Sequence, residues 1–400
     1  MQKYHWIGLT ALALSLSLLV LMLSPGCIKK TNQEGAVRLD DNTILLGTQA
    51  GDYHFSTTCQ MQDGVIMIAS VLSPRSGKQD LVSVIKLSAN GEFIGEQIFP
   101  LHKESILSLL KQKGKGQSLR THQISHHQNH FYVLLTAQAK QTEIPYILKL
   151  DQNGSLLETL KVDLELESGT SIKTCVNAEI LYLSYLNNRE KMLCVSKIDL
   201  LSARVLQTSV RFFRHKNLSI NAVAANPADS IFSVVAYDKE LGCSFFQYTP
   251  QTDLKEMFRT QPATDITALK YFENKLYGAV KEDSLLEVID LTELGKPLIR
   301  VTDIPSAKDF RLVDLVLDKA GFHLLAKSYN LVDEKKSFMA EIISYNPDGS
   351  SAAEKSFPIN ESDTLRQIID DNGTPVFILG EGSDYMESKA SRIFIKSLQS

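Results

Sequence analysis

Four of the nine histidines of this chain lie close together in the sequence. They are His122, His126, His127 and His130. Imidazole nitrogens at such short spacing can bind zinc, copper or nickel when they converge. Alternate side chains of a β-strand point to opposite faces, so we expect His122 and His126 to share a face and His127 and His130 to lie near an exposed turn. Because no carboxylate flanks the cluster, we interpret it as a solvated polar turn and expect no metal.

A second candidate site consists of polar side chains at corresponding positions of an internal repeat. These candidate ligand-binding residues are Lys173, Asn221, Asp314 and Arg366, with His122 in register to within about one residue. If the first strand of each repeat lines a central channel, these side chains can meet around a ligand. The alternative is that they are ordinary polar lining of the channel.

The elements that position these residues follow from a repeat of about fifty residues. Each unit contains an apolar strand, a short polar turn and a second apolar strand, as in ALKYFENKLYGAVK at 268–281. Seven such hairpins occur, and six of them are followed by a third strand, a turn and a fourth strand. Three of these turns contain the Asn-Gly or Asp-Gly pair that tight hairpins favour, at Asn90-Gly91, Asn153-Gly154 and Asp348-Gly349.

This pattern predicts an all-β fold, a β-propeller of seven four-stranded blades. The seventh unit has only three strands and finishes with RIFIKS at 392–397. An incomplete blade would leave an exposed edge, and the apolar stretch Thr43–Leu46 is well placed to supply the missing outer strand. A pair of β-sandwiches is the alternative architecture. The only tryptophan is Trp6, so tryptophan-bearing propeller repeats, including the WD dipeptide, are absent.

The N-terminal segment has the layout of a secretory signal peptide, because an uncharged run from Trp6 to Leu23 precedes Ser-Pro-Gly-Cys. The segment LSPGC at 23–27 resembles a bacterial lipobox. That resemblance implies a signal peptide over 1–26 and a diacylated Cys27. The polar residues that follow indicate a flexible tether over 27–42. The repeat predicts a propeller over 43–400 with an insert at 101–121. An uncleaved anchor or simple secretion are the alternatives.

Composition limits the function classes that fit. The formal net charge is −4, which argues against a nucleic-acid binder, and 44% hydrophobic with 22% charged residues is typical of a globular protein. Four further cysteines, Cys59, Cys175, Cys194 and Cys243, show no CxxC pair. Their apolar surroundings favour free thiols over two disulfides, although an exported chain permits both.

No familiar catalytic or cofactor motif is present, so we expect no cofactor and name no catalytic residue. We predict a lipid-anchored, extracytoplasmic binding or scaffolding module for an envelope protein or glycan. Its contacts would be the membrane, through the lipid on Cys27, and an envelope protein partner. Ile28 is not Asp, and by the lipoprotein resemblance this favours the outer membrane in a Gram-negative source. The alternative is a channel-site, metal-dependent envelope enzyme that resembles lactonases.

Overall fold

The structure is a computed structural model, and it describes most of the chain after residue 35. The described ranges are 36–39, 42–47, 51–61, 63–75, 79–101, 118–139, 141–213, 218–249, 252–261, 264–282, 285–292, 296–301, 309–319, 321–332, 335–371, 374–382 and 391–398. The predicted signal peptide, Cys27 and most of the 101–121 insert lie outside these ranges. Within them, no helix is long and apolar enough to cross a membrane.

Six consecutive four-stranded antiparallel meanders form the first six blades. Blade 1 contains β3 (Gly51–Gln60), β4 (Ile66–Pro74), β5 (Leu81–Leu87) and β6 (Phe93–Phe99), and blade 2 contains β7 (Leu119–His127), β8 (His130–Ala139), β9 (Thr142–Leu150) and β10 (Leu156–Lys161), with the short β11 (Leu166–Glu167) also paired with β9. Blade 3 contains β12 (Ile172–Asn177), β13 (Ile180–Asn187), β14 (Met192–Asp199) and β15 (Val205–Phe212), and blade 4 contains β16 (Leu218–Ala225), β17 (Phe232–Asp238), β18 (Gly242–Thr249) and β19 (Thr252–Arg259). Blade 5 contains β20 (Thr264–Phe272), β21 (Lys275–Glu282), β22 (Leu285–Asp290) and β23 (Lys296–Val301), and blade 6 contains β24 (Asp309–Leu317), β25 (Phe322–Val332), β26 (Lys335–Tyr345) and β27 (Ser351–Ile359).

The seventh blade combines both ends of the described chain. Its strands β28 (Thr364–Asp371), β29 (Thr374–Gly382) and β30 (Arg392–Ser397) are completed by β2 (Thr43–Leu46), which pairs antiparallel with β30. The predicted closure by the N-terminal strand is therefore confirmed. A fifth strand, β1 (Ala36–Arg38), pairs with β2 and lies in the segment that we expected to be a tether.

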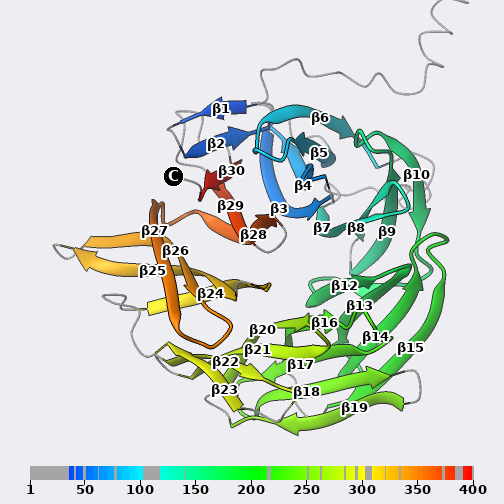
Figure 1. The fold of residues 1–400 in the computed structure, drawn as a ribbon. Helices are drawn as coiled ribbons and strands as arrows, with labels where there is room; N and C mark the ends of the chain where they lie inside the picture. Colours follow the sequence, from blue (N-terminus) through cyan, green and yellow to red (C-terminus); the bar gives the residue numbers. More distant parts are fainter. Residues whose placement is uncertain are drawn as a thin grey trace, which may run out of the picture. The chain divides into compact units, whose positions relative to one another are not determined.

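The seven sheets form a ring, and the first strand of each blade is its innermost strand (Figure 1). These inner strands contact one another in chain order, and β28 of blade 7 contacts β3 of blade 1. The described residues thus form the predicted seven-bladed β-propeller.

Apolar side chains between neighbouring blades hold the ring together. The middle strands are buried on both faces, as the unbroken burial of Ile66–Leu72 in β4 shows. Ile68 and Ile85 of blade 1 share a core cluster with Leu379 and Ile395 of blade 7, so the closing contact has the same apolar character as the others. Such burial contributes about 25 cal/mol for each square ångström of apolar surface.

The three predicted Asn-Gly and Asp-Gly turns are also confirmed. Gly91, Gly154 and Gly349 have φ values of 76°, 79° and 84°, a region that side chains with a Cβ rarely adopt. Each turn joins the third and fourth strands of its blade. These glycines therefore fix the points at which the outer strand folds back on the sheet.

Candidate functional site

A polar cavity of about 730 Å³ lies at one end of the ring and is lined by residues of blades 3 to 7. Its lining residues on the inner strands fall within the first five residues of β12, β16, β20, β24 and β28, so the cavity opens where the inner strands begin. The charged residues of the lining are Lys173, Lys281, Arg311, Lys327, Arg366, Asp265, Glu361 and Asp363. Five successive blades therefore contribute to one site.

β-Bulges recur on the inner strands and decide which side chains reach this region. In blades 2, 4, 5, 6 and 7 one residue of the inner strand is skipped in the pairing with the second strand. The skipped residues are His122, Asn221, Thr267, Val313 and Arg366. A bulge leaves its extra residue unpaired and re-aims the side chains beside it.

The structure brings three of the five predicted ligand-binding residues to the cavity wall: Lys173, Asn221 and Arg366. His122 and Asp314 are not part of the lining. The sequence predicts corresponding positions for Lys173, Asn221, Asp314 and Arg366, with His122 in register to within about one residue. In the structure His122, Asn221 and Arg366 are bulge residues, whereas Asp314 follows the bulge residue Val313.

Asp314 serves a contact between blades. Its Oδ2 accepts a hydrogen bond of 3.0 Å from the backbone N–H of Ile368 in blade 7, and its Oδ1 accepts one of 2.9 Å from Leu315 N–H. Each carboxylate oxygen of Asp314 therefore already accepts a hydrogen bond from the protein backbone. The predicted role of Asp314 as a direct ligand contact is not supported by this geometry.

His122 is held inside the second blade. Its Nε2 lies 2.9 Å from Thr136 Oγ1, and that hydroxyl donates to Glu143 Oε2 at 3.1 Å. Burial lowers the pKa of His122 to about 4, and the positive charges of Arg120 and Lys173 add to this shift. The imidazole is therefore neutral at pH 7.

The other three predicted cluster histidines have separate local contacts. The His126 ring lies 5.0 Å from the Phe131 ring. His127 Nε2 is 3.2 Å from Glu179 Oε1, and His130 Nδ1 is 2.9 Å from the carbonyl oxygen of Gln128. Within the described residues, no group of three or more His, Cys, Asp or Glu side chains is arranged to hold a metal ion.

Asn221 and Asp265 form a polar pair in the cavity wall. Asn221 Nδ2 donates to Asp265 Oδ1 at 2.5 Å, and Ser219 Oγ donates to Asn221 Oδ1 at 2.8 Å. In blade 6, Lys327 Nζ donates to the backbone carbonyl oxygens of Glu361 and Asp363 at 2.8 and 2.6 Å. Lys327 thus fixes the loop between β27 and β28.

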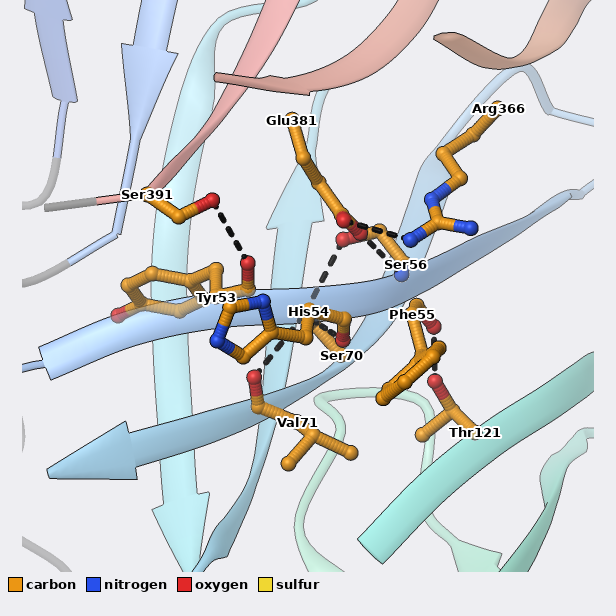
Figure 2. Close-up of polar contacts among 10 residues, drawn as sticks. All are labelled: Tyr53, His54, Phe55, Ser56, Ser70, Val71, Thr121, Arg366, Glu381 and Ser391. Carbon is orange, nitrogen blue, oxygen red and sulfur yellow. Dashed lines mark hydrogen bonds and ion pairs between the residues drawn. The ribbon is translucent and has the colours of Figure 1, made fainter. Parts of the chain in front are cut away.

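Arg366 lies in the cavity wall and also at the seam between blades 7 and 1. Figure 2 shows its contacts at the seam. Its guanidinium donates to Glu381 Oε2 at 2.7 Å, and Glu381 Oε1 accepts from the backbone N–H of Ser56 at 2.5 Å. The Arg366 guanidinium also lies 5.7 Å from the Phe55 ring centroid, and Arg120 lies 5.6 Å from that ring. The charge of Arg366 is therefore largely committed to the seam.

Lys173 and Arg311 differ from the other cations of the cavity. Among the described residues, neither side chain has a hydrogen bond or an ion pair, and both are exposed to the cavity. Enclosure by the surrounding blades lowers the pKa of Lys173, Arg311 lowers it further, and Asp314 acts in the opposite direction. Two unpaired cations therefore repel each other across the cavity.

Sequence reasoning missed Arg311, Lys281 and Lys327. Arg311 precedes the bulge residue Val313 by two positions, as Asp265 precedes Thr267 in the neighbouring blade. Lys281 and Lys327 come from second strands. In the antiparallel register Lys281 lies opposite Asp265, and Lys327 lies opposite Arg311. Aligning the second strands as well as the first would have shown these cations at equivalent positions of blades 5 and 6.

The four cysteines of the described residues are free thiols. Burial raises the pKa of Cys59 and Cys194 to about 11 and that of Cys243 to about 12. At neutral pH such thiols are protonated and weakly reactive. They act as small apolar side chains of the blades, as their strand positions had indicated.

Comparison with known proteins supports the fold. No family model matches the chain, and no curated protein matches it. A chain of the mitotic checkpoint complex has a TM-score of 0.51 and 11% identity over 93% of this chain and 96% of its own. Oligogalacturonate lyase in complex with manganese has a TM-score of 0.51 and 11% identity over 91% and 95%.

The Dos1 propeller is also similar, with a TM-score of 0.49 and 12% identity over 92% of this chain and 88% of its own. At these identities the likeness shows the fold alone. The similar structures include an enzyme and a member of a protein assembly, so the propeller fold does not select a function.

Proposed function

We propose that this chain is a lipid-anchored binding module of the bacterial cell envelope. Cys27 carries the lipid, and the propeller binds an envelope protein or glycan at the cavity between blades 3 and 7. The observation that supports binding is the convergence of side chains from five blades on one open polar cavity of about 730 Å³. Cavities of roughly 300 to 1,000 Å³ are typical of ligand sites.

The lipid anchor is supported by the lipobox-like segment LSPGC at 23–27. A lipid on Cys27 would hold the propeller at the membrane surface, and residues between Cys27 and β1 would set its reach. The metal-dependent hydrolase is the alternative, and no donor set among the described residues favours it.

The anchor is tested by feeding an alkyne-tagged palmitate analogue to a bacterial host that expresses the full chain. We expect the wild type to incorporate the label and to sediment with membranes, and we expect Cys27→Ala to do neither. Cys175→Ala is the matched control, because Cys175 lies on an inner strand, and it should behave as wild type. An unlabelled wild type, or a Cys27→Ala variant that still sediments with membranes, would refute the lipoprotein proposal.

Binding at the cavity is tested by capture from solubilised membranes followed by mass spectrometry. Thr364→Trp places a large side chain at an exposed position of the cavity wall and should abolish capture of the partner. Lys270→Trp changes an exposed inner-strand residue outside the lining and should retain it. Equal capture by both variants would place the binding surface elsewhere on the propeller.

A further inference from the structure

The cations of the cavity divide into paired and unpaired groups. Lys327 is held by two backbone carbonyl oxygens, and Arg366 is paired with Glu381. Lys281 has partners of its own within the protein. Among the described residues only Lys173 and Arg311 bring positive charge to the cavity without a hydrogen bond or an ion pair.

Asp314 does not supply the missing counter-ion. Its two carboxylate oxygens accept hydrogen bonds from the backbone N–H groups of Leu315 and Ile368, and it makes no ion pair with Lys173 within 4 Å. Its charge attracts Lys173 only at longer range, while Arg311 repels it. Two like charges kept together without an ion pair oppose folding, and perturbed charges of this kind are concentrated at functional sites.

The lining contributed by the blades between these two cations has a different chemistry. The Asn221 amide, the Asp265 carboxylate and the Thr267 hydroxyl lie on the inner strands of blades 4 and 5, between those of Lys173 and Arg311. Amide, carboxylate and hydroxyl groups form hydrogen bonds with ligand hydroxyls. The carboxylate of Asp265 would repel a second negative charge, so the lining suits a ligand with one acidic group and several hydroxyls.

We propose that the cavity binds an acidic sugar, free or at the end of a glycan, whose carboxylate or phosphate lies between Lys173 and Arg311. The guanidinium of Arg311 can donate two parallel hydrogen bonds to such an oxyanion, and the ammonium of Lys173 adds a point charge. This inference rests on the proposed cavity function and adds the chemical class of the ligand.

The test is calorimetric titration of the purified full chain in detergent, at constant ionic strength, with three probes. Glucuronate carries a carboxylate, glucose 6-phosphate carries a phosphate, and glucose carries neither. We expect at least one acidic probe to bind at least about tenfold more tightly than glucose, because each hydrogen bond to a charged group contributes to affinity. The carboxylate and phosphate arms show which oxyanion the site prefers.

Variants locate the binding. Lys173→Gln and Arg311→Gln should each weaken the acidic probe about tenfold, and Lys173→Arg should retain most of the affinity. Lys270→Gln is the matched control, because it removes an exposed inner-strand charge outside the cavity lining, and it should bind as wild type. Without ligand, Lys173→Gln should unfold at the same or a higher temperature than wild type, since an unpaired, repelled charge has been removed.

Three outcomes would overturn the proposal. They are no binding of either acidic probe, equal affinity for glucose, or equal weakening by Lys270→Gln. If membrane capture depends on the cavity but no acidic probe binds, the partner is a protein or a neutral glycan and only the acidic-sugar class fails. If an acidic probe binds but Cys27 is not lipidated and nothing is captured, only the anchored-module proposal fails.

Discussion

His122 shows how the channel alters the chemistry of a single side chain. It lies at a bulge of β7, hydrogen-bonded to Thr136, with Arg120 and Lys173 near enough to disfavour a further positive charge. Its pKa is about 4 in the folded protein against 6.5 ordinarily. In the folded protein this histidine is a neutral hydrogen-bonding group.

This shift predicts a pH dependence of stability. Between pH 6.5 and 4 the unfolded chain binds a proton at His122 that the folded chain does not, so stability falls as the pH falls through this window. From pH 7 to pH 5, wild type should lose about 1 to 2 kcal/mol more than His122→Gln. Urea unfolding of both proteins at the two pH values measures this difference.

A direct control is the NMR titration of the imidazole. A His122 resonance that titrates near pH 6.5 would contradict the predicted shift, whatever the unfolding data show. The sequence identified His122 as a channel residue, but its neutrality depends on Arg120 and Lys173, and Lys173 belongs to another blade.

At the scale of elements, the seam between blades 7 and 1 depends on polar contacts as well as apolar packing. Glu381 of β29 joins Arg366 of β28 to the backbone of Ser56 in β3 (Figure 2). Ser391 adds a second link, because its Oγ donates to the Tyr53 carbonyl oxygen at 3.0 Å. These contacts fix the inner strand of blade 1 to blade 7, and the Thr58 N–H of β3 adds another by donating to Gln367 Oε1 of β28 at 3.2 Å.

Removing the carboxylate of Glu381 should weaken this seam. Glu381 is buried, so Glu381→Ala leaves both the Arg366 guanidinium and the Ser56 N–H without their partner. We expect the free energy of unfolding to fall by about 2 kcal/mol or more. Urea unfolding measures the loss, with the exposed Glu354→Ala on β27 as the control.

Glu354→Ala should change stability by less than about 0.5 kcal/mol, as expected for an exposed surface site. Equal losses in the two variants would show that the Glu381 contacts do not stabilise the seam. The sequence indicated that β28 and β29 pair. It did not indicate that Glu381 also accepts a hydrogen bond from β3, near the other end of the chain.

At the scale of the whole molecule, the ring is closed by chain segments more than 300 residues apart. β2 pairs with the edge of β30, and β1 pairs with β2, so the last blade has five strands. Leu45 and Leu46 of β2 are buried in the clusters that join blade 7 to its two neighbours. The N-terminal strand therefore contributes to both interfaces of the closing blade.

Removing this strand should destabilise the complete ring. A chain that lacks residues 36–46 leaves β30 as an unpaired edge strand and uncovers both clusters. We expect a lower unfolding temperature and concentration-dependent aggregation, measured by calorimetry and light scattering. A chain that lacks only residues 28–35 retains β1 and β2 and should remain monodisperse, and equal behaviour of the two deletions would contradict the role of β2 in closure.

The propeller fold could be predicted from the sequence alone. Apolar strands, Asn-Gly and Asp-Gly turns and the fifty-residue repeat are local signals, and each of the first six blades forms from strands that follow one another in the chain. Even the pairing of Thr43–Leu46 with the last blade was predictable, because an open edge on RIFIKS needs a strand.

The composition of the cavity wall, in contrast, depends on how the blades are arranged in three dimensions. A bulge shifts the strand register by one residue and has no clear sequence signal. Asp314 therefore lies at a contact between blades and not in the cavity wall, whereas Arg311 lies in the wall. Whether a charge is free also depends on groups in other blades. Arg366 is paired by Glu381, and Lys173 is not paired by any described residue. Electrostatic neighbours are set by three-dimensional distance, which sequence spacing does not give.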